Sequence, residues 1–376
     1  MNSQDKTYKE KIDIILKSNI GNIKSNIILK KIFNHIQKKK TLEIAQYNKY
    51  ILQKLNLNIN DYKEYSEKYS SIEIEIIPSP YIKGNFINIK NEKDNDYYHI
   101  YFNDNKKEEI KRTKLNEEDD ISKITVVIDY QVDSFIGLFC DCKCISSIYF
   151  KKFYRNNINN MSGMFSNCSS LRNLNFSNFN TNNVTDMSRM FQDCWNLCEL
   201  NVSNFNTHNV TNMEEIFSGC CRLEKLDLSN FNTEKVTNMC GMFFSCTSLK
   251  ELNVSSFNTI NVKRMKCMFF DCSSLTELNI SNFNTTNVID MNNMFCGCYN
   301  LKELNITKSN EDIELLKDLD DEFLSLYEFK FSDFSDFNID NVEDMKEMFD
   351  GCTDELKMQV LEQFKYSKKK PFKIHY

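Results

Sequence analysis

The sequence predicts an α/β fold, a right-handed solenoid in which each 26-residue unit holds one short parallel strand and one helix. The first supporting observation is a sequence motif that recurs with a constant period of 26 residues. It begins at Met161, Met187, Met213, Met239, Met265 and Met291. The other two observations are a strand pattern and an apolar stripe with helical spacing inside each repeat of this motif. A fixed period of this length indicates a solenoid, because one unit alone cannot bury its apolar face.

The predicted strand has the pattern L-x-x-L-N-Φ, as in Leu174-Asn175-Phe176, where Leu174 and Phe176 are expected to point inward. Neighbouring strands would be parallel, and parallel strands need a crossover, which the rest of the unit supplies. The predicted helix has apolar positions spaced 3, 3, 1 and 3 residues apart, which is a helical spacing. In one unit these are Val184, Met187, Met190, Phe191 and Cys194.

The same apolar slots are filled one period before Met161, starting at Phe135, so the sequence predicts seven units over residues 135–306. Stacking would place identical side chains above one another in buried columns. The phenylalanine column is Phe153, Phe179, Phe205, Phe231, Phe257 and Phe283. The cysteine column is Cys142, Cys168, Cys194, Cys220, Cys246, Cys272 and Cys298.

The full pattern, M-x-x-M-F-x-x-C-x-x-L-x-x-L-N-Φ-S-x-F-N-T-x-N-V-T-x-M, resembles the repeat of BspA-type leucine-rich-repeat proteins. It covers residues 135–306 and returns in part over 337–352. The resemblance implies a leucine-rich-repeat-like solenoid with an adhesive or protein-binding role and no catalytic activity. It also implies a cell-surface adhesion or host-interaction protein, which we keep as the alternative function.

Residues 1–70 are predicted to form a helical module. The segment 27–56, with its I-L-x-x-I-F-x-x-I spacing before a lysine-rich turn, resembles an F-box. That resemblance implies docking to a Skp1-type adaptor of a ubiquitin ligase through Ile32, Phe33 and Ile36. The other interpretation is that these side chains form the core of a helical cap, because apolar stripes at helical spacing usually face a core.

The remaining segments complete the predicted organisation. Residues 71–134 alternate apolar and polar side chains and are expected to form a small β-rich capping region. Residues 307–352 read as degenerate repeats, with one atypical unit before the motif restarts near Met345. Residues 353–376 are expected to form a capping helix and a basic tail.

Composition narrows the function classes. The net charge of −6 and the balanced charge of the repeats give no basic stripe for nucleic acid. No stretch approaches the ~20 apolar residues that span a bilayer. The polar start of the chain and the many cysteines favour a cytoplasmic protein with reduced thiols. The cysteine and histidine spacings fit no zinc site, and no catalytic motif is present, so we expect neither enzyme activity nor a cofactor or metal.

The predicted binding surface is the outward face of the strands, where a column of Asn and Asp runs beside a column rich in Glu. Its residues are Asn175, Glu199, Asn201, Lys225, Asp227, Glu251, Asn253, Glu277, Asn279, Glu303 and Asn305. Glutamates on successive rungs repel one another, and a basic partner would relieve this repulsion. Neighbouring lysines and water can also screen these charges. The sequence therefore predicts a non-enzymatic protein-binding solenoid, in its most specific form an F-box-like substrate receptor, whose partner it does not name.

Overall fold

The computed structural model describes residues 53, 59–306, 342–345 and 347–363. The chain divides into two compact units, Met1–Ser70 and Ser71–Tyr376. The described part of the first unit is essentially one helix, α5 (Ile59–Tyr69). The predicted adaptor-binding residues Ile32, Phe33 and Ile36 lie outside the described residues.

The second unit begins with a mixed five-stranded sheet in the order β3-β5-β1-β6-β7. These strands are β1 (Ile72–Pro78), β3 (Tyr98–Phe102), β5 (Ile124–Ile128), β6 (Ile145–Lys152) and β7 (Asn173–Asn175). The strand β1 is antiparallel to both β5 and β6, whereas β6 and β7 are parallel. Alternate residues of β1 are buried, as its alternating sequence requires. The sheet thus joins the 71–134 region directly to the first repeats.

Three short elements complete this region: β2 (Gly84–Asn85), β4 (Lys114–Leu115) and the 3₁₀ helix η2 (Glu92–Tyr97). The strands β2 and β4 pair antiparallel. Between them and the repeats, Asn88 donates from its backbone N–H to the carbonyl of Leu138 at 2.7 Å. Its side-chain amide also donates to the carbonyl of Cys140. Asn88 therefore satisfies carbonyl groups at the open edge of the first repeat.

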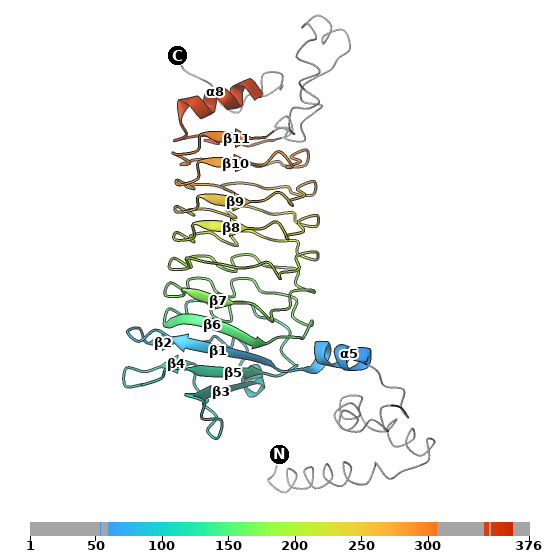
Figure 1. Cartoon of the computed structure of the whole chain (residues 1–376), viewed down its shortest axis with the longest axis vertical. Helices are drawn as coiled ribbons and strands as arrows, with labels where there is room; N and C mark the ends of the chain where they lie inside the picture. The colour runs from blue at the N-terminus through green and yellow to red at the C-terminus, as the bar shows by residue number, and fades with distance from the viewer. Residues whose placement is uncertain (1–52, 54–58, 307–341, 346, 364–376) are drawn as a thin grey trace, which may run out of the picture. The chain divides into compact units, whose positions relative to one another are not determined.

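Each later repeat forms one coil, and the coils lie one above another from β6 to β11 (Figure 1). Their strands are β8 (Lys225–Asp227), β9 (Glu251–Asn253), β10 (Glu277–Asn279) and β11 (Glu303–Asn305). The pairs β8–β9 and β10–β11 are parallel and in register. A second line of parallel bridges joins Asn160, Asp186, Asn212, Asn238, Arg264, Asp290 and Asp344. Equivalent residues of successive coils are therefore neighbours.

The helix predicted in each unit is not formed in the described coils, where this segment is a chain of turns. Gly163 and Asn167, four residues apart, have φ of 59° and 58°, and other coils repeat the pattern. Left-handed residues interrupt a right-handed helix. The backbone N–H groups of Gly163, Phe165 and Asn167 instead donate to carbonyls of the next coil, at 2.8, 2.9 and 2.7 Å. The peptide groups are thus satisfied between coils rather than within a helix.

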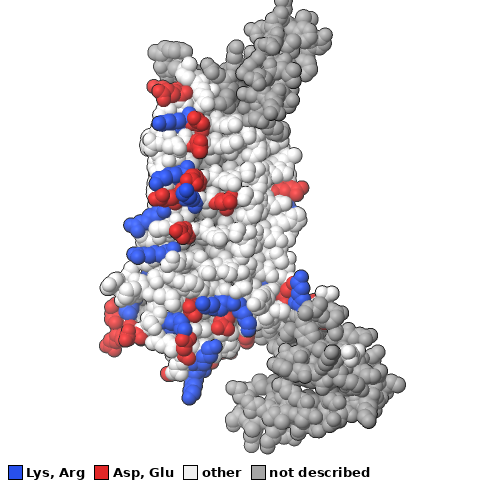
Figure 2. Space-filling view, in the orientation of Figure 1, with Lys and Arg blue, Asp and Glu red and all other residues white. Residues whose placement is uncertain are grey.

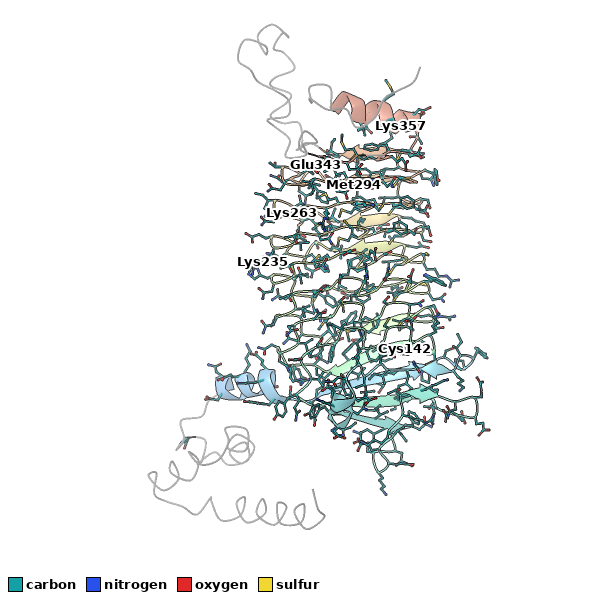
Figure 3. All side chains as sticks on the ribbon, turned by 180° about the vertical axis from the view of Figure 1, so that it is seen from behind. Cys142, Lys235, Lys263, Met294, Glu343 and Lys357 are labelled. Atoms are coloured by element: carbon teal, nitrogen blue, oxygen red, sulfur yellow. The ribbon has the colours of Figure 1, made fainter. Side chains whose placement is uncertain are left out.

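The apolar side chains of these turns and strands fill the interior of the coils (Figure 3). One column of stacked rings runs through the turn segments, with neighbouring centroids 5.2–5.9 Å apart. Its members are Phe139, Phe165, Phe191, Phe217, Phe243, Phe269, Phe295 and Phe349. The predicted column from Phe153 to Phe283 is also buried. Each ring contacts only neighbouring coils, so packing energy is shared locally.

Among the described residues, the returning motif at Met345 pairs directly with the motif at Met291. The N–H of Met291 donates to the carbonyl of Asp344 at 2.9 Å, and the rings of Phe295 and Phe349 stack with centroids 5.2 Å apart. The residues that we expected to build the extra unit lie within 307–341, outside the described residues. The buried columns therefore continue from the coil at Met291 to the described residues of 342–352.

The last described element is α8 (Asp354–Gln363), which lies over the end of the stack (Figure 1). The hydroxyl of Thr353 accepts a hydrogen bond from the N–H of Leu356 at 3.2 Å and so caps the helix. Leu356 and Val360 are buried, one turn apart on the same face. This helix covers apolar surface that a further coil would otherwise bury.

Candidate binding surface

The structure gathers the predicted binding residues on one exposed face, which we call the strand face. It is formed by β7–β11 and by residues 199–201, which run at the same level of their coil. All eleven predicted side chains of this face are exposed. Figure 2 shows acidic and basic side chains gathered over this part of the coils, whereas most of the visible remainder of the stack is uncharged.

Part of the charge on the strand face is internally compensated. Lys225 of β8 forms an ion pair with Glu251, its in-register neighbour on β9. Lys250 forms another with Glu224, at 3.0 Å. These pairs are exposed, so each contributes little to stability, about 0–1 kcal/mol. Their main effect is to orient charges along the face.

A second part of the charge is not compensated in this way. Glu277 of β10 and Glu303 of β11 are in register, and neither has an ion-pair partner among the described residues. Parallel neighbours lie ~4.8 Å apart, so the two carboxylates repel each other. Asp227 of β8 adds a third carboxylate to the face, and hydrogen bonds from Ser229 and Asn253 lower the pKa of this carboxyl. The later coils of the strand face therefore favour a cationic neighbour.

The column of Asn and Asp has a structural task that the sequence did not reveal. The side-chain oxygen of Asn175 accepts the backbone N–H of Ser177 at 2.9 Å, which ends the strand in an Asx turn. The equivalent bonds recur at Asn201, Asp227, Asn253 and Asn279. One oxygen of each is thus already used, and the side-chain amide of Asn253 also donates a hydrogen bond to the carboxylate of Asp227 on the preceding coil.

The strand face is hollowed rather than deeply pocketed. One open hollow of about 680 Å³ lies over β8–β11, and Lys225, Glu251, Glu277 and Glu303 line it together with the asparagine column. A second, of about 700 Å³, adjoins it around Cys198 and Arg222. Proteins usually bind small molecules in enclosed sites. A shallow surface of this kind is better suited to an extended segment or a flat surface of a macromolecular partner.

The cysteines predicted to stack form an interior column that ends at Cys352. The thiol of Cys194 donates to the carbonyl of Phe165 at 3.2 Å, and the same bond recurs from coil to coil. Burial raises the pKa of these thiols, to about 12 at Cys352. Protonated buried thiols are poor nucleophiles and poor metal ligands. No group of three or more His, Cys, Asp or Glu side chains that could hold a metal is found among the described residues.

Regular stacking of parallel 26-residue coils, with a polar strand face on a buried core, defines the chain as a repeat protein. The sequence matches the family described as "Mycoplasma protein of unknown function, DUF285", over residues 133–227, 221–330 and 270–371. The matches together extend over well more than half of the chain, which therefore belongs to this family. No curated protein and no solved structure matches the sequence. Within the described residues, no helix is long and apolar enough to cross a membrane.

Proposed function

We propose that the protein is a non-enzymatic interaction module that binds a protein partner on the strand face. The observation that carries the proposal is the pair Glu277 and Glu303, exposed and in register without a cation between them. A lysine or arginine of a partner placed over β10 and β11 would replace repulsion by attraction. The exposed side chains of Asn253 and Asn279 add polar groups to the same surface.

Affinity capture from cell extract tests this proposal. The full chain is immobilised and compared with the double variant Glu277→Gln/Glu303→Gln, which keeps side-chain size and removes both charges. A matched control, Glu117→Gln/Glu234→Gln, removes two exposed glutamates elsewhere. We expect the strand-face variant alone to lose a captured protein, with stronger loss at low salt. Equal capture by all three chains would refute the strand face as the binding site.

In fold class, we propose that the coils form a right-handed leucine-rich-repeat-like solenoid with turns in place of the expected helix. The parallel strands and the 26-residue register support this assignment. Parallel strands joined by a crossover are right-handed in nearly all proteins. The close likeness of the sequence pattern to BspA-type repeats supports the same class.

We propose the cytoplasm as the location, supported by the unpaired thiols of the cysteine column. The alternative is a BspA-like surface protein that mediates adhesion or host interaction, supported by the repeat pattern itself. Protease treatment of intact cells separates the two. Protection of the chain until the cells are lysed favours the cytoplasm, and digestion of the chain on intact cells favours the surface.

The proposed adaptor function of residues 27–56 rests on the F-box resemblance alone. Pull-down of a purified Skp1-type adaptor by the full chain tests it, with Phe33→Ala as the variant. Loss of binding on substitution supports an F-box-like receptor. Failure of the unmodified chain to bind the adaptor removes this version and leaves the strand-face proposal untouched.

A further inference from the structure

A second exposed surface, formed by the turn segments, carries an apolar patch. The rings of Phe244 and Phe270 stack on neighbouring coils, with centroids 4.7 Å apart and planes 6° apart. Both are partly exposed, whereas Phe243 and Phe269, next to them in the sequence, are fully buried. The equivalent residues of other coils are Cys140, Ser166, Gln192, Ser218 and Cys296. Closing the coil therefore does not require an aromatic ring at this position.

Two thiols extend this patch, which we call the turn-face patch. Cys296 continues the column of Phe244 and Phe270 into the next coil and is partly exposed. Cys267 occupies the place of Gly241, where an added Cβ would lie 3.6 Å from the Cβ of Phe244. By the repeat, Cys267 occupies the corresponding place beside Phe270. Burial raises the pKa of both thiols, so they remain uncharged at neutral pH and act as small apolar groups.

Carboxylates lie around the turn-face patch. The backbone N–H of Asp271 donates to the carbonyl of Cys296 at 2.7 Å, and the N–H of Gly297 donates to that of Asp350 at 2.8 Å. Besides burial, the negative charges of Asp350, Glu347 and Asp271 raise the pKa of the Cys296 thiol. On the opposite side, the Glu215 side chain lies against Gly241, where an added Cβ would be 3.0 Å from its Cγ. Besides burial, Lys266 lowers the pKa of the Cys267 thiol, whereas Asp290 and Glu215 raise it. The rim of the patch is therefore predominantly acidic, and most strongly so toward the last coil.

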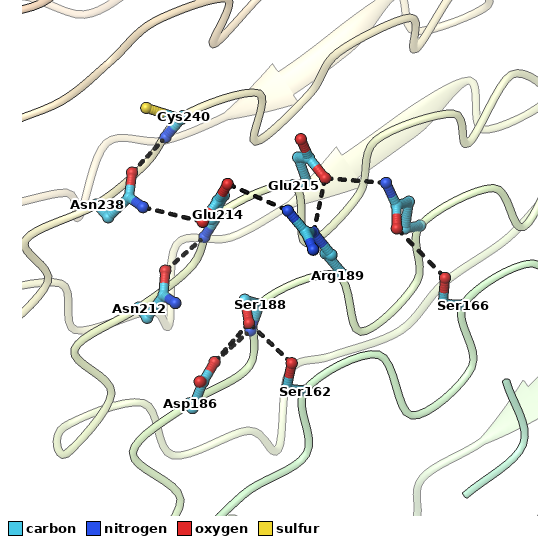
Figure 4. A network of polar contacts seen from close by, with 11 residues as sticks. Ser162, Ser166, Asp186, Ser188, Arg189, Asn212, Glu214, Glu215, Asn238 and Cys240 are labelled. Carbon is cyan, nitrogen blue, oxygen red and sulfur yellow. Dashed lines mark hydrogen bonds and ion pairs between the residues drawn. The ribbon is translucent and has the colours of Figure 1, made fainter. Parts of the chain in front are cut away.

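The earlier-coil side of this rim is fixed in place by a polar network (Figure 4). Arg189 donates to Glu215 at 2.9 Å and to Glu214 at 3.4 Å. Gln192 donates to Glu215 at 2.9 Å, and Asn238 donates to Glu214 at 3.1 Å. These bonds link three coils and hold the two glutamates beside the apolar surface, where a flexible side chain would otherwise move away.

We propose that the turn-face patch docks a basic amphipathic segment of a partner protein, with apolar side chains over Phe244 and Phe270 and lysine or arginine against the acidic rim. An apolar centre inside a polar rim is the usual anatomy of a protein interface. Aromatic faces also attract a cation placed over them. The acidic rim repels phosphate, which disfavours nucleic acid and anionic lipid. A different part of each coil forms the strand face, so neither proposal depends on the other.

A binding measurement on the full chain tests the patch. The probe is a fluorescein-labelled synthetic peptide with leucines at i, i+3, i+4 and i+7 of a helix and lysines elsewhere, followed by anisotropy. We expect Phe244→Ser/Phe270→Ser to weaken binding by about tenfold or more. Serine occupies this position in other coils, as at Ser166, so the variant should keep its fold. Circular dichroism checks this, and Phe244→Gln/Phe270→Gln provides a second variant, because Gln192 occupies the same position in its own coil.

Charge and surface controls complete the test. Asp350→Asn should weaken binding and reduce its salt dependence, whereas Glu277→Gln/Glu303→Gln on the strand face should leave it unchanged. A peptide with glutamates in place of lysines should not bind. Equal binding of the two peptides, or equal binding of the phenylalanine variants and the unmodified chain, overturns the proposal. So does a dimer of the unmodified chain in sedimentation velocity that the phenylalanine variants abolish, because the occupant would then be a second copy.

Discussion

Breaking one buried aromatic column should lower the urea midpoint of unfolding more sharply than removing a whole coil. The ring of Phe243 is fully buried and stacks between Phe217 and Phe269, with centroids 5.9 and 5.4 Å away. Phe243→Ala deletes both contacts and leaves a cavity, at a cost of about 3–5 kcal/mol in the free energy of unfolding. The two stacked pairs account for about 0.5–1.5 kcal/mol each.

Deletion of residues 239–264 removes one complete period and leaves no cavity. The ring of Phe217 would then stack on Phe269, and Lys225 would lie beside Glu277. Every column stays continuous, because each coil contacts only its neighbours. The free energy of unfolding and its dependence on urea both decrease with the number of coils, so the urea midpoint should change little.

Urea unfolding followed by circular dichroism, and by fluorescence of Trp195, the single tryptophan, measures both effects. For Phe243→Ala we expect a midpoint lowered by about 1 M or more at an unchanged slope. For the deletion we expect a lower slope at a similar midpoint. A deletion variant that fails to fold, or whose midpoint falls further than that of Phe243→Ala, would show that the coils are not interchangeable units.

Three further predictions concern a glycine in a turn, a threonine hydroxyl that links two coils, and the buried thiols. In urea unfolding, Gly219→Ala should destabilise the chain more than Gly163→Ala. Both glycines have positive φ, but of the two only Gly219 would place an added Cβ 3.2 Å from the backbone of the preceding coil. Equal losses of stability in the two variants would contradict this prediction. Thr233→Val should lower the free energy of unfolding by about 2–4 kcal/mol, and Thr233→Ser should lower it much less. The reason is that the Thr233 hydroxyl donates to the carbonyl of Asn258 and accepts from its N–H, both at 2.8 Å. Equal melting temperatures of the two variants would exclude a stabilising role of these two bonds. The interior thiols, with pKa raised to about 12 at Cys352, stay protonated when folded but ionise when unfolded. The free energy of unfolding should therefore fall as pH rises above about 8.5, and a flat urea-stability profile from neutral pH upward argues against the buried column.

The period and the inward columns could be predicted from the sequence because identical spacing places identical side chains at identical positions. Met187, Phe191 and Cys194 are all fully buried. Their spacing alone could not distinguish a helix from a chain of turns, since both put these side chains on one side. The distinguishing signal is the recurrence of Gly, Asn or Asp at the position of Asn167 in most coils, as at Asp193 and Gly219, because these residues tolerate positive φ.

The strand face could be predicted as an exposed row because side chains alternate along a strand. The use of the Asn175 oxygen in an Asx turn was missed, although Asn two residues before Ser in most repeats carries that signal. The turn-face patch was also missed. The 26-residue period pairs Phe244 with Phe270, but the partial exposure of their rings became visible only with the turns of the structure.

The segment after Ile306 shows a different limit of the sequence pattern. The motif restarts 54 residues after Met291, close to two periods, and that distance suggested an intervening coil. Sequence distance does not fix which coils are adjacent. A buried column needs matching side chains on adjacent coils, but it does not limit the number of residues that connect those coils. The bond from Met291 to Asp344 shows that the ladder resumes directly.

Site-specific photo-crosslinking tests the proposed strand-face function most directly. A photoactivatable amino acid placed at Asn279, on the strand face, is compared with the same group at Glu234, which is exposed elsewhere on the coil. We expect irradiation in cells to attach a discrete protein partner at position 279 and not at position 234. Crosslinking of that partner only at position 234, or at neither position, contradicts a binding function of the strand face.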